Sequence, residues 1–259
     1  MIIQNHGYRI IVGMTTWPKR IDYIEPSIRS ILLQKQKPYI FYLVLSEQEF
    51  PNKVLPKFIN DYLKEYPNFK LLWIKENLYQ FKKNIPILKL YKNRSDIVYF
   101  SADDDVCYHE NYIKTLYEKF IALNINGDTL LTWHFPWEEF ILKTTNYKNN
   151  EHIRLIGWCE IFKPSFFNNI VTSITENDIK VNYFNKNAWI SEDLWISYNL
   201  QQAGITFVQD DYSELEQLVE KTENENNNPL SKIYLGIPDS IMFNNVKELY
   251  DRKKLIYGV

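Results

Sequence analysis

Residues 97–106, with the sequence IVYFSADDDV, lead from an apolar run into three consecutive aspartates. A short apolar run of this kind is typical of a buried strand. Three adjacent carboxylates repel one another unless a cation lies beside them. Mg²⁺ and Mn²⁺ take oxygen ligands and bridge to substrate phosphates. The stretch therefore predicts a strand that ends in a D-x-D metal site for a nucleotide-linked substrate.

A second interpretation of the three aspartates needs no metal. Aspartate is favoured at helix N-caps, so the run would form an acidic turn before the next helix. A cap uses only one aspartate, however, and three follow one another here. The metal site is the favoured interpretation.

The composition is that of a globular protein with a full core. Of 259 residues, 45% are hydrophobic, enough for one large domain or two subdomains. The net charge of −2 and a pI near 6.1 give no general attraction to nucleic acid. No apolar run approaches the roughly 20 residues of a membrane span, and the first residues do not resemble a signal peptide. With only Cys107 and Cys159, we expect a reduced, cytoplasmic protein, with one disulfide as the alternative.

Strand-like and helix-like segments alternate through the first half of the chain, which predicts a parallel sheet covered by helices. Ligands of such sheets bind beyond the carboxyl ends of the strands. The loops 15–20, 46–51, 75–84 and 101–110 would share that rim with the aspartates. The predicted strands are 8–14, 39–46, 69–74 and 97–100, and the predicted helices are 21–31, 54–66, 85–91 and 112–123.

The second half is less regular. The pattern indicates strands at 130–133, 153–156 and 205–208, and a helix over 194–200 that ends near Gly204. Residues 214–228 are polar and acidic and are expected to form a mobile loop or a frayed helix. Residues 133–139, WHFPWEE, are either an aromatic, acidic acceptor pocket or core followed by a surface turn.

Six short motifs follow one another along the chain. They are TTWPKR at 15–20, the strand ending in Leu45-Ser46, ENLYQFKKNIP at 76–86, ADDDVCY at 102–108, GWCEIFKP at 157–164 and SEDLW at 191–195. In this order they resemble the motifs of small bacterial GT-A glycosyltransferases. The resemblance covers about residues 8–210 and implies an α/β, Rossmann-like GT-A domain with a mixed sheet flanked by helices. Residues 1–126 would form its nucleotide-sugar-binding half and residues 127–259 its acceptor-binding half.

The resemblance also implies roles for the residues of the first half. Asp105 is expected to bind Mn²⁺ or Mg²⁺ directly, Asp103 to face the metal or the ribose, and Asp104 to lie behind them. Arginine and lysine offset phosphate charge, and hydroxyls at strand ends can contact the donor. The remaining residues expected on the donor side are Thr15, Arg20, Ser46, Lys82 and Lys83.

Two acidic residues carry the expected acceptor chemistry. The acceptor hydroxyl loses a proton as it attacks the sugar, and a carboxylate can take it. The resemblance points to Asp193 as this base, with Glu192 as the alternative, and to inversion at the sugar. Acidic residues after the cap Ser191 are also ordinary partners of a helix dipole, so a purely structural role stays open.

Three classes of function follow from these patterns. The favoured one is a metal-dependent glycosyltransferase that uses a nucleotide-sugar donor and a glycan or lipid-linked acceptor. The others are a phosphohydrolase using Asp103 and Asp105, and a catalytically silent sugar- or nucleotide-binding module. The resemblance suggests surface-polysaccharide assembly, with peripheral contact to the inner face of a membrane through Lys253, Lys254 and Tyr257.

Overall fold

The computed structural model of the protein describes residues 7–123, 129–133, 161–167, 169–180, 192–210, 217–222 and 239–257. Its centre is a seven-stranded sheet in the order β3-β2-β1-β4-β7-β6-β8. All neighbouring strands are parallel except those beside β7, which is antiparallel to β4 and β6. The strands are β1 Arg9–Thr15, β2 Ile40–Ser46, β3 Phe69–Ile74, β4 Ile97–Ser101, β6 Thr129–Trp133, β7 Ile161–Phe162 and β8 Thr206–Asp210.

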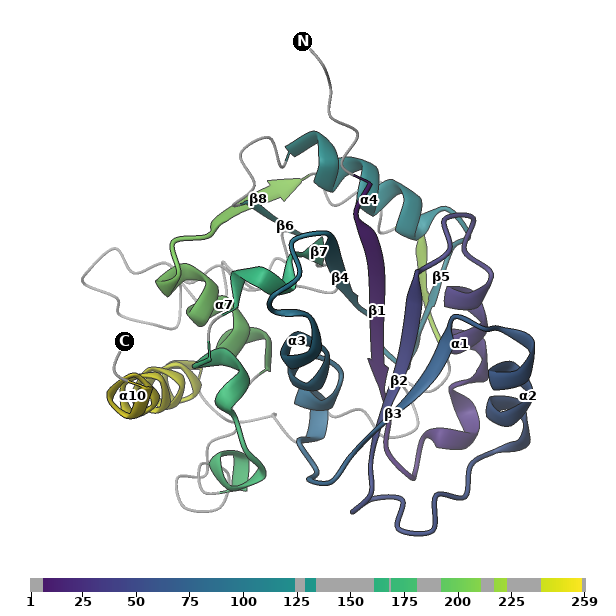
Figure 1. The fold of residues 1–259 in the computed structure, drawn as a ribbon, viewed down its shortest axis with the longest axis horizontal. Coiled ribbons are helices and arrows are strands. Elements are labelled where there is room, and N and C mark those ends of the chain that lie inside the picture. Colours follow the sequence, from purple (N-terminus) through teal and green to yellow (C-terminus); the bar gives the residue numbers. More distant parts are fainter. Residues whose placement is uncertain are drawn as a thin grey trace.

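This topology confirms the expected Rossmann-like, mixed α/β sheet flanked by helices (Figure 1). The four strands predicted in the first half form its parallel part, β3-β2-β1-β4. The carboxyl ends of β1, β2, β3 and β4 therefore share one edge, as predicted. The strand predicted at 153–156 lies outside the described residues, as do residues 134–139 of the expected acceptor pocket and the predicted cap Ser191.

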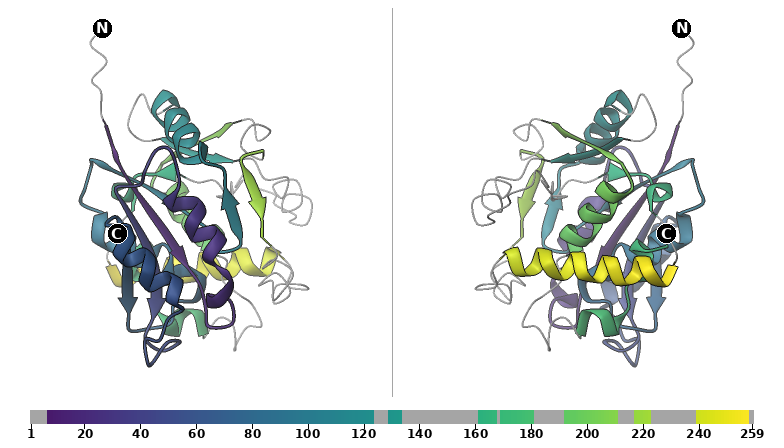
Figure 2. Two further views of the ribbon diagram at one scale, coloured as in Figure 1. Left: turned by 90° about the vertical axis from the view of Figure 1, so that its right-hand side faces the viewer. Right: turned by 90° about the vertical axis from the view of Figure 1, so that its left-hand side faces the viewer.

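Two apolar clusters cover the two faces of the sheet. Successive side chains of a strand point to opposite faces. Accordingly Val12 of β1 belongs to a cluster with buried residues of α1, α2 and α4, whereas Ile11 belongs to one with buried residues of α3, α7 and α10. The two sets of helices lie on opposite sides of the sheet (Figures 1 and 2). The helices are α1 Glu25–Leu32, α2 Lys57–Glu65, α3 Ile85–Tyr91, α4 Tyr112–Leu123, α7 Glu192–Gln202 and α10 Asp239–Tyr257, with short 3-10 helices η1 Ile21–Tyr23, η2 Tyr79–Lys82, η3 Pro164–Phe166 and η4 Val171–Ser173.

The predicted bounds of α3 and α4 are confirmed, and those of α2 need one correction. The sequence prediction placed Pro56 inside the first turn of that helix. In the structure Pro56 is the N-cap, with φ −53° and ψ 147°, and the helix begins at Lys57. Proline is compatible with both positions because it has no N–H to donate, so its identity alone does not fix the boundary.

Residues 217–222 correct the prediction of a mobile loop or frayed helix over 214–228. They form a turn and the strand β9 Val219–Lys221, which pairs antiparallel with β5 Val106–Tyr108 just after the three aspartates. Leu218 and Val219 pack against the core cluster of α1 and α4. This stretch of a polar region therefore belongs to the folded domain.

The C-terminal helix α10 has no counterpart in the sequence prediction. It lies beside α7 (Figure 2), and its Val246, Leu249 and Tyr250 are buried in the same apolar cluster as residues of α7. Lys253 donates to Asp178 at 2.7 Å. Lys253, expected at a membrane surface, is thus turned into the protein. The following Leu255 and Ile256 are exposed. Across the described ranges, no helix combines the length and apolar composition that a membrane crossing requires.

Candidate functional site

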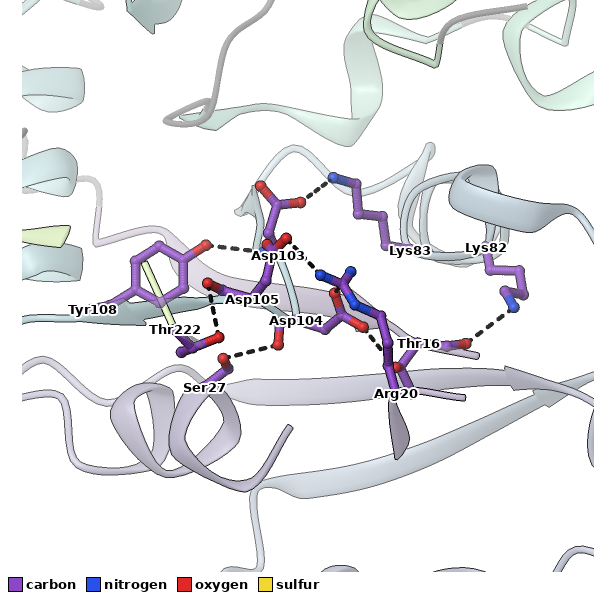
Figure 3. Close-up of polar contacts among 10 residues, drawn as sticks. All are labelled: Thr16, Arg20, Ser27, Lys82, Lys83, Asp103, Asp104, Asp105, Tyr108 and Thr222. Carbon is purple, nitrogen blue, oxygen red and sulfur yellow. Dashed lines mark hydrogen bonds and ion pairs between the residues drawn. The ribbon is translucent and has the colours of Figure 1, made fainter. Parts of the chain in front are cut away.

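The three aspartates lie where β4 ends and before β5 begins, on the rim predicted from the sequence (Figure 3). Three residues from other parts of the chain make hydrogen bonds to their main chain. The Asp103 amide donates to Tyr108 Oη at 2.9 Å, and Ser27 Oγ donates to the Asp104 carbonyl at 3.0 Å. Thr222 donates to the Asp105 carbonyl from its amide, at 2.8 Å, and from Oγ1, at 3.1 Å. The turn is therefore fixed before any ligand binds.

Asp104 is a buried structural carboxylate. Thr16 Oγ1 donates to its Oδ2 at 2.6 Å, and Arg20 Nη1 lies 2.7 Å from its Oδ1. Burial raises the pKa of the Asp104 carboxyl to about 6, outweighing the opposite effects of Arg20 and Thr16. Both oxygens of this side chain are occupied inside the protein, in keeping with the expected place behind its neighbours.

Asp103 and Asp105 are the more accessible members of the run. Their side chains are 28% and 27% exposed. Lys83 Nζ lies 2.7 Å from Asp103 Oδ1, and Arg20 Nη2 lies 2.8 Å from Asp105 Oδ2 (Figure 3). Cations of the protein thus already oppose the repulsion that led to the metal prediction. The adjacency of the aspartates alone does not require a metal.

The donor set fits a metal shared with a substrate rather than a closed metal cage. Within the part of the chain that the structure describes, no three His, Cys, Asp or Glu side chains converge as a ligand set. Mg²⁺ is commonly held by one or two carboxylates together with substrate phosphates and waters. Asp103 and Asp105 supply such a pair of partly exposed carboxylates. The residues present therefore fit this kind of site.

The structure separates the two neighbouring lysines. Lys82 is 1% exposed, donates to the Thr16 carbonyl at 3.1 Å and pairs with Glu49. Burial lowers its pKa, against the opposing effect of Glu49. Lys82 thus joins two rim loops from inside, which corrects the expectation that its ammonium faces donor phosphates. Lys83 points to Asp103 instead.

Gly13 allows the segment that carries Lys83 to pack on β1. A Cβ at Gly13 would lie 2.7 Å from the Lys83 carbonyl oxygen and 2.3 Å from Tyr99 Oη. Tyr99 Oη in turn donates to that carbonyl at 2.7 Å. The backbone of Lys83 is therefore fixed against β1 while its side chain reaches the aspartates.

Thr15 and Ser46 lie at the carboxyl ends of β1 and β2, as expected, but their hydroxyls take part in local contacts. Thr15 Oγ1 donates to the Val44 carbonyl at 2.7 Å. Ser46 Oγ accepts from the Glu49 amide at 3.2 Å and donates to the Glu49 carboxylate at 3.1 Å. These bonds shape the rim. A contact of either hydroxyl with a donor stays a prediction.

Glu192 and Asp193 open α7 and reach the same rim from the other half of the chain. Glu192 is 4% exposed, accepts from Asn84 Nδ2 and lies 3.8 Å from Lys83 Nζ. Burial raises its pKa well above the ordinary value. Asp193 is an exposed residue, yet the atoms packed around its carboxyl raise its pKa to about 6, with Asp103 adding to the effect and Lys83 opposing it.

Several residues of the site were not predicted from the sequence. Thr16 and Asn84 lie inside recognised motifs, at 15–20 and 76–86, so a closer look at those motifs would have found them. Glu49 and Thr222 lie outside every motif, and their contacts with Lys82 and Asp105 join distant parts of the chain.

No protein-family model and no curated protein matches the chain. Among solved structures, a crystal structure of residues 1–349 of S. aureus TarS is similar to it, with a TM-score of 0.45 and 13% identity over 92% of this chain and 71% of that chain. This is a loose likeness in fold.

Proposed function

We propose that the protein is a glycosyltransferase that moves a sugar from a nucleotide-diphosphate donor to a hydroxyl of a glycan or lipid-linked acceptor. One observation carries the proposal. Lys83 Nζ lies 2.7 Å from Asp103 of the β4 rim and 3.8 Å from Glu192 of α7. The carboxylates suited to the donor and those suited to the acceptor therefore belong to a single site.

The charges of this site support a bound divalent cation. Among the described residues, its ion-paired network and Asp193 contain six carboxyl groups and three cations. Even with a proton on Glu192, whose pKa burial raises well above its ordinary value, the remaining carboxylates outnumber the cations. A metal ion beside Asp103 and Asp105 would offset the excess negative charge and would itself be shared with the donor diphosphate. We propose Mn²⁺ or Mg²⁺ for this position. The carboxyl groups are Glu49, Asp103, Asp104, Asp105, Glu192 and Asp193, and the cations are Arg20, Lys82 and Lys83.

In the proposed reaction, the acceptor oxygen bonds to the anomeric carbon while the bond from that carbon to the diphosphate breaks. A bound divalent ion acts as a Lewis acid for the departing diphosphate. Arg20 holds Asp105 in place, and Lys83 adds positive charge on the side of Asp103. Asp193 takes the acceptor proton, because Glu192 is closed to solvent and bonded to Asn84. A direct displacement of this kind inverts the anomeric centre.

The phosphohydrolase alternative finds less support. That reaction needs an aspartate free to attack phosphorus. Both aspartates named for it are paired with cations of the protein, Asp103 with Lys83 and Asp105 with Arg20. The pair Glu192–Asp193 would also have no role in it. A silent binding module stays an outcome of the experiment below.

The test is turnover of a panel of UDP-, GDP-, CDP- and dTDP-sugars, with and without Mn²⁺ and with excess chelator. We expect nucleotide release that needs the metal and falls at least about 100-fold in Asp105→Asn, since Lewis-acid stabilisation is worth several kcal/mol. Asp22→Asn, an exposed position on η1, is the matched control. Release of phosphate from monoesters would identify a phosphohydrolase, and binding without turnover a module. Full turnover in excess chelator would contradict the proposed metal.

A further inference from the structure

The contact between Thr222 and Asp105 joins a segment without any recognised motif to the centre of the candidate site. Thr222 gives the Asp105 carbonyl both of its donors, the amide at 2.8 Å and Oγ1 at 3.1 Å (Figure 3). The two residues are 117 positions apart in the chain. We propose that residues 217–222, here called the β9 strap, position Asp105 for the metal, with Thr222 as the positioning residue. The inference rests on the proposed function.

The strap is anchored on both sides of this contact. β9 pairs with β5 in register, with Val106 opposite Lys221, Cys107 opposite Glu220 and Tyr108 opposite Val219. At the far end, the His109 amide donates to the Leu218 carbonyl at 2.7 Å. Leu218 and Val219 pack against the core. The strap therefore follows the chain from Asp105 through His109 without a break.

The strap acts on Asp105 through its main chain. Arg20 Nη2 lies 2.8 Å from the Asp105 carboxylate, and the Asp105 side chain is 27% exposed. Its carbonyl is fixed by Thr222, and the next residue, Val106, begins the pairing with β9. Because the peptide after Asp105 is held, the Cα from which the Asp105 carboxylate extends has a fixed position. A ligand held within a fraction of an ångström of its working position binds a metal more tightly than one that must first be ordered.

The threonine hydroxyl offers a clean way to test this role. Thr222→Val keeps the shape of the side chain and the amide bond but removes the Oγ1 donor. Thr222→Ser keeps the donor and should restore the contact. Glu220→Gln is the matched control, because Glu220 is an exposed residue on the same strand and belongs to no part of the proposed machinery.

Two measurements on the full chain separate positioning from a general structural role. The first is Mn²⁺ binding followed by electron paramagnetic resonance, with UDP present at a fixed concentration. We expect Thr222→Val to bind Mn²⁺ about three- to tenfold more weakly, because binding must then also order Asp105, at a cost typical of ordering one side chain. Thr222→Ser and Glu220→Gln should match the parent protein. The second is hydrogen exchange of the peptide covering residues 101–108, which should speed up in Thr222→Val alone, while the thermal midpoint stays within a few degrees.

The outcomes distinguish this inference from the function on which it rests. The parent protein could turn over nucleotide sugars while Thr222→Val equals it in Mn²⁺ affinity and in hydrogen exchange of residues 101–108. That result would contradict the positioning role of the β9 strap and leave the proposed function intact. Weaker Mn²⁺ binding that Thr222→Ser does not restore would overturn the role of the hydroxyl. A parent protein that binds no Mn²⁺ and consumes no nucleotide sugar would remove the proposed function, and the strap inference with it.

Discussion

Arg20 and Asp104 form an ion pair that is closed to solvent. Arg20 Nη1 lies 2.7 Å from Asp104 Oδ1, and the two side chains are 7% and 9% exposed. The pair joins the loop after β1 to the turn after β4. The second guanidinium nitrogen, Nη2, continues to Asp105 at 2.8 Å. Through Arg20, the enclosed Asp104 therefore helps to position the partly exposed Asp105.

The first prediction concerns this pair. Asp104→Asn removes one charge and leaves the Arg20 guanidinium buried with less compensation. Breaking a buried pair in this way typically costs about 3–5 kcal/mol, so we expect a loss of that order in the free energy of unfolding, measured in urea. The control is Asp96→Asn, which breaks the exposed pair with Arg94 and should change the free energy of unfolding far less, because exposed ion pairs contribute little to stability. Equal losses in the two variants would contradict a structural role for Asp104.

The second prediction concerns the contact of β1 with the Lys83 segment. In Gly13→Ala the new Cβ meets Tyr99 Oη at 2.3 Å, Ile87 Cδ1 at 2.5 Å and the Lys83 carbonyl oxygen at 2.7 Å. The last of these is backbone, so a rotamer change does not relieve it. Overpacking of this kind costs about 1–3 kcal/mol. The control is Gly7→Ala, whose new Cβ has nothing within 4 Å and which should unfold at nearly the parent urea concentration. A Gly13→Ala protein as stable as Gly7→Ala would show that the Lys83 backbone can move away from β1 at no cost.

The third prediction separates the adjacent lysines. Lys83→Met removes the cation beside Asp103, and the loss of a charged hydrogen bond should lower kcat/KM about 10- to 100-fold while the fold is retained. Lys82→Met leaves Glu49 without its buried partner and should lower stability by about 1.5–3 kcal/mol. The paired readouts are steady-state kinetics and urea unfolding. The opposite assignment, with Lys82 affecting turnover alone, would contradict the placement of both side chains.

The fourth prediction is a pH dependence set by Asp193. The atoms packed around its carboxyl raise its pKa to about 6, with Lys83 opposing the effect and Asp103 adding to it, and a general base works only when deprotonated. We therefore expect kcat/KM to be level above about pH 6 and to fall about tenfold per unit below it. Asp193→Asn should lose about 10²–10⁴-fold in kcat and the acidic limb of the profile with it.

Glu192→Gln is the companion variant for this test. It keeps the size of the buried side chain and a carbonyl that accepts from Asn84, so the acidic limb should remain. An acidic limb that disappears in Glu192→Gln and persists in Asp193→Asn would move the role of base to Glu192.

The sequence was sufficient where local pattern decides the structure. The apolar runs of β3 and β4, the bounds of α3 and α4 and the rim that carries Asp103 to Asp105 follow from periodicity and from the rule that parallel strands end at one edge. The C-terminal helix α10 could not be found in this way. It is polar for much of its length, and its order comes from packing Val246, Leu249 and Tyr250 beside α7.

Contacts between distant residues explain the remaining misses. Lys82 and Lys83 are identical neighbours, and only the path of η2 turns one toward Glu49 and the other toward Asp103. The contacts of Arg20 and Lys83 with the aspartates are also absent from the local pattern, so the sequence alone does not show that cations of the protein oppose the repulsion of the three carboxylates. The pairing of β9 with β5 depends on a partner more than 100 residues away, which no local pattern reveals.

The strand β7 runs antiparallel to both of its neighbours in the seven-stranded sheet, and this direction decides which edge of the sheet its ends face. Leu131 of β6 pairs with Ile161, and Ile161 with Phe100 of β4. The end of β6 at Trp133 and the start of β7 at Ile161 therefore lie at the edge where β4 ends and the aspartates follow. An insertion at either of these two strand ends would enter the molecule on the side of Asp103 and Asp105, whereas an insertion at the opposite edge would leave that rim unchanged.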